Sequence, residues 1–233
     1  MNQEKLLENL KNININLSKK QLNQLEIYYE KIIEYNKIHN LTRITEKEEV
    51  YLKHFYDSLT LATLENLSGP KSLCDMGSGA GFPGIVLKIA FPDLKITLVD
   101  SLKKRTIFLE KVINDLKLEK ISVYNERAED FAKKNIETFD FITARAVAST
   151  PILLELGVPM LKINGHMLIM KAKNENLNEA TNALKTLNSE IEKVKEINLP
   201  ITNEKRMLIK VKKVSKTNSK YPRNYSQIKK KPL

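Results

Sequence analysis

The chain has 233 residues, of which 42% are hydrophobic, so it is long enough and apolar enough to bury a proper core, and its composition excludes disorder. A single cysteine excludes a disulfide framework, and together with three scattered histidines it offers no metal site. The net charge of +11 lies entirely in the last 29 residues, which hold eleven Lys and Arg and no Asp or Glu, so we expect a nucleic acid partner.

No apolar stretch approaches the length that crosses a membrane, and the polar N-terminus is not followed by the apolar run of a signal peptide. The lone cysteine, Cys74, falls in a predicted strand, which agrees with a reducing compartment. We therefore expect a cytoplasmic protein that binds neither membrane nor metal, and we expect it to be a monomer.

Residues 1–66 are expected to form a small helical cap. The apolar spacing predicts helices over residues 3–11, 18–37 and 50–64. Ser18 with Gln21, and Thr45 with Glu48, have the form of capping boxes that would begin the second and third of these helices.

A turn-rich linker over residues 66–70 leads into a main domain, residues 67–214, in which strands and helices alternate. Strands are predicted over residues 72–76, 95–100, 121–125, 139–144, 166–171, 192–199 and 206–214, and helices over 85–91, 103–116, 151–161 and 177–188. This alternation predicts a seven-stranded, mostly parallel sheet with helices on both faces, a Rossmann-like α/β fold. Residues 215–233 are polar and basic and are expected to form an extended tail.

Four of the seven glycines fall between Gly77 and Gly84, in the loop between the first predicted strand and the next helix. The spacing fits two ligands. Gly-x-Gly-x-x-Gly, followed about 20 residues later by Asp100, fits a dinucleotide, whereas Asp75-x-Gly-x-Gly-x-Gly fits S-adenosylmethionine. We favour S-adenosylmethionine, because the Asp75 carboxylate suits a cationic cofactor and Pro83 removes a backbone N–H that a pyrophosphate would use.

In an open α/β sheet the ligand lies at the carboxyl ends of the strands, where four predicted strands place polar residues. Asp75 and Asp100 end the first and second strands, Glu129 follows the third, and Arg145 follows the fourth. A carboxylate after the second strand can accept hydrogen bonds from both ribose hydroxyls. Glu129, with the adjacent backbone amide, could hold an adenine edge.

Several motifs resemble those of the RsmG family, the bacterial 16S ribosomal RNA guanine-N7 methyltransferases formerly called glucose-inhibited division protein B. They are Asp75–Gly84, Asp100–Arg105, Arg127–Glu129, residues 143–147, the cap segments Tyr35–Thr42 and His54–Leu59, and the tail segments Lys220–Arg223 and Lys231–Leu233. The chain departs from the family pattern where Tyr35 replaces a tryptophan, and where Ser226 and Ile228 replace Gly and Pro.

The resemblance implies a class I S-adenosylmethionine-dependent methyltransferase that methylates N7 of a guanosine, position 527 in the conventional numbering, in 16S rRNA of the small ribosomal subunit. From the residues and the resemblance together, the cofactor-binding residues are expected to be Asp75, Gly77, Gly79, Phe82, Asp100, Ser101, Ala128, Glu129 and Arg145. No general base stands out, and N7 alkylation needs none, because that atom carries a lone pair and no proton. Catalysis would then rest on alignment, with Arg145 also holding the base or its phosphate.

The RNA is expected to contact Lys104, Arg105, Lys220, Arg223, Lys229, Lys230 and Lys231. Three alternatives remain open from the sequence. The chain could be a methyltransferase acting on another RNA base or on protein, an NAD-dependent oxidoreductase, or an RNA-binding factor without activity.

Overall fold

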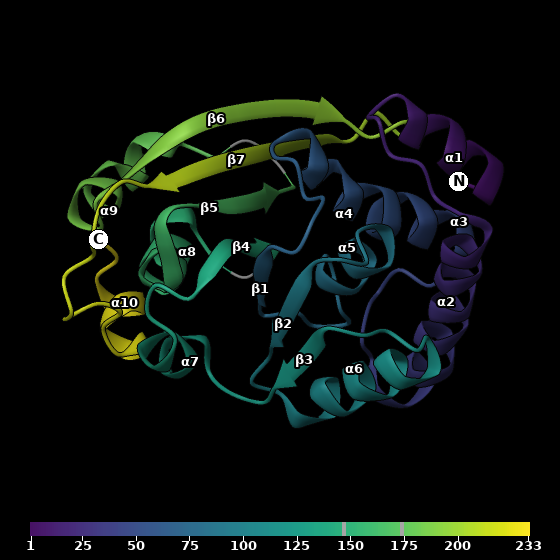
Figure 1. Cartoon of the computed structure of the whole chain (residues 1–233), viewed down its shortest axis with the longest axis horizontal. Coiled ribbons are helices and arrows are strands. Elements are labelled where there is room, and N and C mark those ends of the chain that lie inside the picture. The colour runs from purple at the N-terminus through teal and green to yellow at the C-terminus, as the bar shows by residue number, and fades with distance from the viewer. Residues whose placement is uncertain (146–147, 173–174) are drawn as a thin grey trace.

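The computed structural model describes residues 1–145, 148–172 and 175–233; residues 146 and 147, which belong to the motif that begins at Thr143, lie outside these ranges. Its centre is a seven-stranded sheet in the order β3-β2-β1-β4-β5-β7-β6 (Figure 1). The strands are β1 (Ser72–Met76), β2 (Lys95–Val99), β3 (Ile121–Tyr124), β4 (Phe139–Arg145), β5 (Leu161–Lys171), β6 (Ser189–Asn198) and β7 (Lys205–Lys213). The pairs among β1 to β5 are parallel, and β7 runs antiparallel to both β5 and β6, so the predicted mostly parallel sheet is confirmed.

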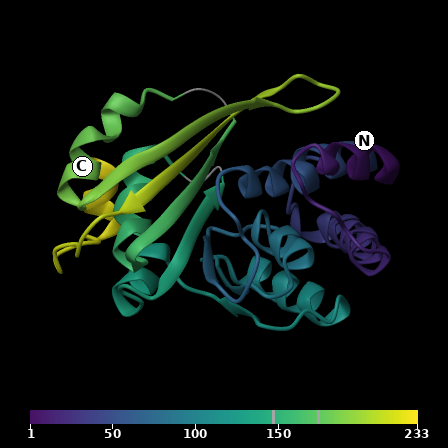
Figure 2. The same cartoon turned by 45° about the horizontal axis from the view of Figure 1, so that its top comes forward.

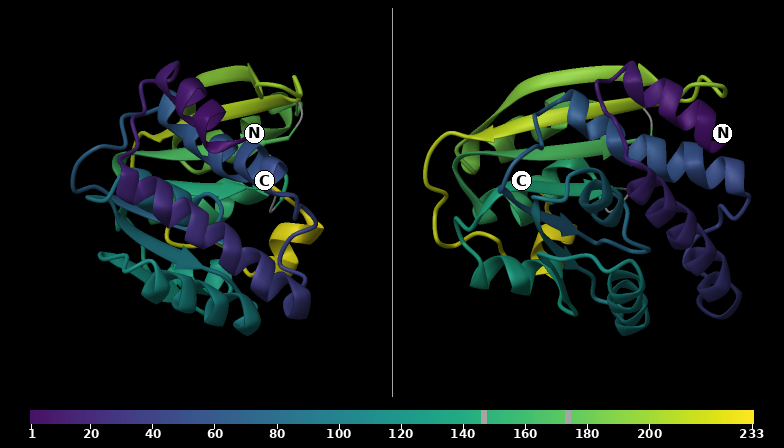
Figure 3. Two further views of the ribbon diagram at one scale, coloured as in Figure 1. Left: turned by 90° about the vertical axis from the view of Figure 1, so that its right-hand side faces the viewer. Right: turned by 45° about the vertical axis from the view of Figure 1, so that its right-hand side comes forward.

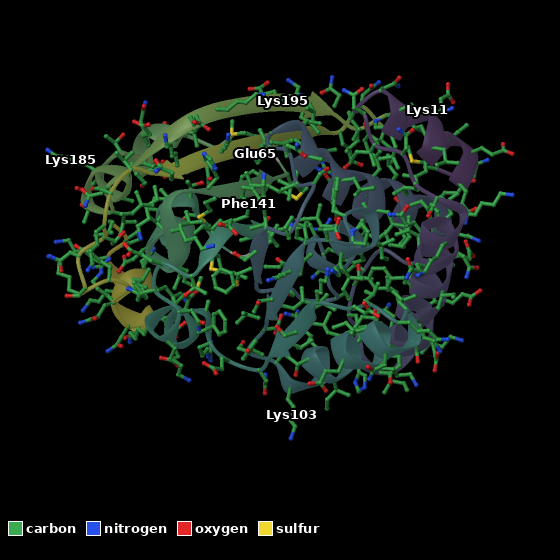
Figure 4. The ribbon with its side chains drawn as sticks, viewed as in Figure 1. Lys11, Glu65, Lys103, Phe141, Lys185 and Lys195 are labelled. Atoms are coloured by element: carbon green, nitrogen blue, oxygen red, sulfur yellow. The ribbon has the colours of Figure 1, made fainter. Side chains whose placement is uncertain are left out.

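Side chains of each strand alternate between two hydrophobic cores, because successive residues of a strand point to opposite faces. In β1, Leu73 belongs to the core on the cap side, whereas Cys74 and Met76 belong to the core on the other side. Phe141 of β4 lies in the cap-side core, and the stick view shows it inside the molecule, while the side chain of Lys103 points away from it (Figure 4).

The cap begins with α1 (Gln3–Lys11) and α2 (Lys19–His39), as predicted. The capping box of Ser18 and Gln21 is present. The second predicted capping box is wrong, because the next helix starts after Glu46, which makes no side-chain cap. That helical run continues through α3 (Lys47–Val50), a π-helical turn η1 (Tyr51–Tyr56), α4 (Asp57–Leu59) and a 3-10 turn η2 (Thr60–Thr63).

The cap packs directly on the sheet domain. Leu25, Tyr28 and Ile32 of α2 lie in one hydrophobic core with α5 (Gly84–Ala90) and α6 (Lys103–Asp115). The views in Figure 3 show the purple N-terminal helices lying against the blue and teal helices that flank this face. The opposite face is covered by α7 (Ala128–Lys134), α8 (Thr150–Gly157), the 3-10 turns η3 (Val158–Met160) and η4 (Leu177–Ala180), and α9 (Thr181–Thr186).

Several segments differ from the sequence expectation. Helix α7 was not predicted, and β5 begins five residues earlier than expected, at Leu161. The helix predicted over residues 177–188 is a 3-10 turn followed by the short α9. Figure 2 shows the long, gently curved hairpin of β6 and β7 that forms one edge of the sheet.

The C-terminal segment is folded, so the expectation of an extended tail is wrong. Residues of helix α10 (Tyr225–Lys230) lie beside α7 and α8 (Figure 1), and Ile228 is fully buried. The backbone N–H of Ile228 donates to the carbonyl of Asn224 at 3.1 Å. A proline at position 228, as in the family pattern, could not make this bond, so the departure from that pattern suits a helix here.

Candidate cofactor and substrate site

A cavity of about 410 Å³ opens at the carboxyl ends of β1, β2, β3 and β4. This volume lies in the range of small-molecule sites. Its walls come from the glycine loop after β1, the start of the segment after β2, the N-terminus of α7, and the cap. The ligand is thus expected where the parallel strands end, as the sequence indicated.

The glycine loop leaves open space at Gly79 and is packed tightly at Gly81. A Cβ at Gly79 would have no neighbour nearer than the Gly77 carbonyl at 3.9 Å, but at Gly81 it would meet the Tyr28 hydroxyl at 2.6 Å. Both residues have positive φ angles, 59° and 94°, which favour glycine. The Tyr28 hydroxyl also donates to the carbonyl of Ala80, so helix α2 of the cap holds the loop in place.

Asp75 lies behind the loop and does not line the cavity. Its carboxylate is fully buried and accepts a hydrogen bond of 2.9 Å from the N–H of Gly84, the first residue of α5. Burial raises the pKa of Asp75 from 3.8 to about 7. The N-terminus of α5 already has an acceptor, so it is poorly suited to a pyrophosphate.

Asp100 lies at the cavity wall and is almost fully buried. Its carboxylate accepts hydrogen bonds from the backbone N–H groups of Gly79 and Leu102, both at 2.9 Å, and from Arg105 at 3.2 Å. These bonds fix both oxygens, and a carboxylate has further lone pairs with which to accept ribose hydroxyls. Ser101 lines the cavity beside it.

The third wall is the start of α7, where Arg127, Ala128 and Glu129 line the cavity. Within residues 1–145, 148–172 and 175–233, neither the Arg127 guanidinium nor the Glu129 carboxylate has a hydrogen-bond or ion-pair partner. Glu129 therefore remains available to accept from an adenine amino group, and Arg127 adds a free positive charge at the mouth of the site.

The fourth wall joins the end of β4 to the cap. The guanidinium of Arg145 donates to the Lys53 carbonyl and to Nδ1 of His54, both at 3.1 Å, and lies 4.9 Å from the centre of the Phe82 ring. His54 stacks on Phe82 with 4.3 Å between ring centres. Burial and the nearby Arg145 lower the pKa of His54 to about 3, so this imidazole is neutral at physiological pH.

The structure brings together eight of the nine predicted cofactor residues in one cavity, all except Asp75. It adds residues that the sequence analysis did not assign to the site: Leu41, Thr42, His54, Ser78, Ala80, Arg127, Leu156 and Tyr225. Thr42 and His54 were noted only as part of cap motifs, and no signal in the sequence pointed to Tyr225, which comes from the folded C-terminal segment.

The predicted RNA-contacting residues fall into two groups. Lys104, Lys220, Lys229, Lys230 and Lys231 are exposed. Arg105 and Arg223 are instead engaged within the protein, Arg105 with Asp100 and Arg223 with the buried carboxylate of Glu155. Their positive charge is largely compensated, which makes them weak candidates for phosphate contacts.

The cavity suits S-adenosylmethionine on the chemistry of its lining. Asp100 and Glu129 supply acceptors for a ribose and an adenine, Gly77 and Gly79 leave room for close approach, and Phe82 adds an apolar surface. In the part of the chain that the structure describes, no group of three or more His, Cys, Asp or Glu residues is placed to hold a metal ion. Among the same residues, no helix combines the length and the apolar character needed to cross a membrane.

Solved structures of methyltransferases share this fold. The chain is similar to a SAM dependent methyltransferase from Aquifex aeolicus, with a TM-score of 0.57 and 17% identity over 75% of this chain and 97% of that one. It is also similar to precorrin-6y C5,15-methyltransferase from Geobacter metallireducens, with a TM-score of 0.55 and 14% identity over 73% and 90% of the two chains. These likenesses confirm the predicted class I methyltransferase fold.

Much higher identity links the chain to ribosomal RNA small subunit methyltransferase G of two bacteria. It is 45% identical to that protein from Lactobacillus johnsonii over 100% of both chains, and 44% identical to that from Bacillus subtilis over 100% of this chain and 99% of the other. The family model GidB, described as rRNA small subunit methyltransferase G, matches residues 21–210. The chain therefore belongs to the rRNA small subunit methyltransferase G family, the family that its sequence motifs predicted.

Proposed function

We propose that this enzyme transfers the methyl group of S-adenosylmethionine to N7 of a guanosine in 16S rRNA of the small ribosomal subunit, in the cytoplasm. Membership in the family gives the class of enzyme and of substrate. The observation that carries the proposal is the single cavity in which the glycine loop, Asp100, Glu129 and Arg145 meet.

The residues of the cavity would hold the cofactor by complementary chemistry. Asp100 would accept from the ribose hydroxyls, and Glu129 with the Ala128 amide would bind the adenine edge. Gly77 and Gly79 would allow the methionine portion to approach the backbone. When bound, S-adenosylmethionine supplies a methyl group activated by its sulfonium.

The protein's contribution to the chemistry is alignment. The N7 lone pair of guanine would form the new N–C bond, the electrons of the broken C–S bond would leave with sulfur, and no proton would have to be removed. No side chain is needed as a base, which agrees with the neutral, low-pKa His54 in the wall. Arg145, anchored on the Lys53 carbonyl and stacked on Phe82, would position the base or its phosphate.

The target guanosine must be unstacked to enter the cavity, because N7 of a base in an RNA helix lies in a deep, narrow groove. The C-terminal segment that contributes Tyr225 to the cavity also carries exposed lysines. Lys220, Lys229, Lys230 and Lys231 would bind flanking phosphates, together with Lys104 of α6.

An NAD-dependent oxidoreductase is disfavoured by Asp75. A pyrophosphate would approach the N-terminus of α5, where the first N–H already donates to this buried carboxylate. A methyltransferase of this family needs no phosphate there, so the same contact is compatible with the proposed function.

The proposal is tested by incubating the purified protein with isotope-labelled S-adenosylmethionine and small subunits from a strain that lacks the gene. Mass spectrometry of the digested RNA should detect one new 7-methylguanosine. A label on another base would reassign the substrate, and binding of subunits without any methyl transfer would favour a non-catalytic RNA-binding factor.

A further inference from the structure

The cap side of the cavity carries a chain of three hydrogen-bonded side chains, Arg145, His54 and Thr42. Nη2 of Arg145 lies 3.1 Å from Nδ1 of His54, and Nε2 of His54 lies 3.0 Å from Oγ1 of Thr42. All three residues line the cavity, although Arg145 is more than 90 positions from His54 in the sequence. The chain therefore links the end of β4 to the loop that follows α2.

Arg145 determines which nitrogen of His54 carries the hydrogen. A guanidinium can only donate, so the Nδ1 atom that it contacts must present its lone pair, and the hydrogen must lie on Nε2. Nδ1 is also 3.1 Å from the Lys53 carbonyl, which accepts a hydrogen bond from Nη1 of Arg145 and has a second lone pair that an Nδ1–H could use. The positive charge of the Arg145 guanidinium beside Nδ1 favours the tautomer that presents a lone pair there and carries its hydrogen on Nε2.

With the hydrogen of His54 on Nε2, the Thr42 hydroxyl can take part in a further hydrogen bond only as a donor. Its oxygen accepts hydrogen bonds from Nε2–H of His54 and from the backbone N–H of Ile44 at 3.1 Å, which fills both lone pairs. Asn36 accepts from the backbone N–H of Thr42 at 2.9 Å and holds the residue in place. For the O–H of Thr42, the described ranges of the chain, with their gaps at 146–147 and 173–174, offer no acceptor.

A hydroxyl that can only donate a hydrogen bond would distinguish guanine from adenine in this cavity. Adenine and guanine both carry N7, but the neighbouring group is the O6 acceptor in guanine and the N6 amino donor in adenine. A hydrogen bond to O6 also leaves the N7 lone pair free to react, whereas a donor placed on N7 itself would block it. Thr42 lines the cavity together with His54, Phe82 and Arg145, which form its wall at the end of β4 and in the cap.

We propose, on the basis of the function proposed above, that the Thr42 hydroxyl donates a hydrogen bond to O6 of the target guanine and selects it over adenine. Thr42 is then a specificity-determining residue. His54 and Arg145 are positioning residues that hold the hydroxyl in its donating state.

The test pairs a change in the protein with a change in the base. Small subunits reconstituted with guanine or with 2-aminopurine at the methylated position are compared, because 2-aminopurine retains N7 and lacks O6. Single-turnover methylation is measured for the wild type and for Thr42→Val, which keeps the shape and removes the hydroxyl. Loss of O6 should slow the wild type at least about tenfold more than it slows Thr42→Val, since one base-edge hydrogen bond is at stake.

Thr42→Ser is the matched control, because it retains the hydroxyl and should show the coupling of the wild type. If Thr42→Val and the loss of O6 slow methylation independently of each other, the proposal is overturned. So would a loss in Thr42→Val confined to the Kd for S-adenosylmethionine, which would assign Thr42 to the cofactor. Failure of the wild type to form 7-methylguanosine on unmodified subunits is a separate result, and it would overturn the proposed function itself.

A second measurement needs no variant. The chain has only three histidines, so nitrogen-15 NMR of the imidazole rings can resolve His54 and report its tautomer. We expect hydrogen on Nε2 and none on Nδ1 across neutral pH. Hydrogen on Nδ1 would mean that Thr42 donates to His54, and the proposal would be wrong.

Discussion

The Arg223 guanidinium and the fully buried Glu155 carboxylate form a two-pronged ion pair, with Nε at 2.7 Å from Oε1 and Nη2 at 2.6 Å from Oε2. The backbone N–H of Arg223 adds a third bond to the same carboxylate at 3.1 Å. Because Tyr225, two residues later, lines the cavity, this ion pair fixes part of the wall of the proposed cofactor site.

Replacing Arg223 with Ala should therefore destabilise the protein and weaken cofactor binding. The change leaves the buried charge of Glu155 without its partner, and breaking such a pair costs about 3 kcal/mol or more. Chemical denaturation would report the free energy of unfolding, and calorimetric titration the Kd for S-adenosylmethionine. Lys220→Ala removes an equal charge from an exposed site of the same segment and should leave both values unchanged. Equal behaviour of the two variants would contradict the prediction.

The salt dependence of RNA binding should depend on the exposed lysines of α10 and its end. Replacing Lys229, Lys230 and Lys231 with Ala should reduce the slope of log affinity against log salt by roughly two, at about 0.7 for each single-strand phosphate contact. The triple variant is preferable to truncation after Val214, which would also remove the buried Tyr221 and Ile228. Binding of small subunits at several salt concentrations measures the slope.

An unchanged slope in that triple variant would assign these lysines a role outside RNA binding. Lys185→Ala is a suitable control, because this residue lies in α9 and its side chain points outward at the opposite edge of the molecule from the cap (Figure 4). It should leave the slope as in the wild type.

The parts of the fold and site that depend on local spacing could be predicted from the sequence. The glycine loop and the acid at the end of β2 are recognised from residues close together in the chain, and short apolar segments indicated all seven strands. Helix α7 was missed because it has only seven residues, of which few are buried.

The cap side of the site could not be predicted, because it depends on contacts between distant residues. Arg145 donates a hydrogen bond to the carbonyl of Lys53, 92 positions away. The residue spacing within either segment does not indicate this contact. The same holds for the C-terminal segment, where Arg223 meets Glu155 across 68 positions. From sequence alone, a basic segment is expected to be exposed to solvent. Only the structure shows that one of its residues, Arg223, is paired with a buried acid.

Asp100→Asn should weaken binding of S-adenosylmethionine by about tenfold or more. The carboxamide loses one acceptor for the ribose. Its amino group faces either the N–H of Leu102 or, at the other oxygen position, both the N–H of Gly79 and the Arg105 guanidinium. Isothermal titration measures the Kd. Asp93→Asn, at a carboxylate that is 68% exposed, is the control and should bind as the wild type does. An unaltered Kd in Asp100→Asn would remove the ribose assignment.

Arg145→Ala should reduce the rate of methyl transfer more than the affinity for the cofactor. The variant loses the bonds to Lys53 and His54 and the stacking on Phe82, and we expect at least a tenfold lower single-turnover rate with a smaller change in Kd. Arg145→Lys should not restore the rate, because an ammonium cannot make the two-pronged contact. Arg43→Ala controls for loss of an exposed positive charge. A defect confined to the Kd would make Arg145 a cofactor-binding residue only.

The raised pKa of Asp75 predicts how stability depends on pH. Its value is about 7 in the folded protein and 3.8 in the unfolded chain, so the folded state binds the proton more tightly. The unfolded chain therefore releases this proton first, and the wild type should lose stability as pH rises from about 4 to 7, by up to about 4 kcal/mol. Asp75→Asn does not titrate and can still accept from the N–H of Gly84.

We compare the unfolding free energies of Asp75→Asn and the wild type without cofactor. The stability of the variant relative to the wild type should increase between pH 4 and 7 and stay constant above pH 7. Denaturant unfolding at a series of pH values measures it. Asp93→Asn, at an exposed carboxylate, should show no such trend. A difference that stays constant with pH would mean that Asp75 is ionised throughout this range, with its charge compensated by the N–H of Gly84 and the positive charge of Arg145.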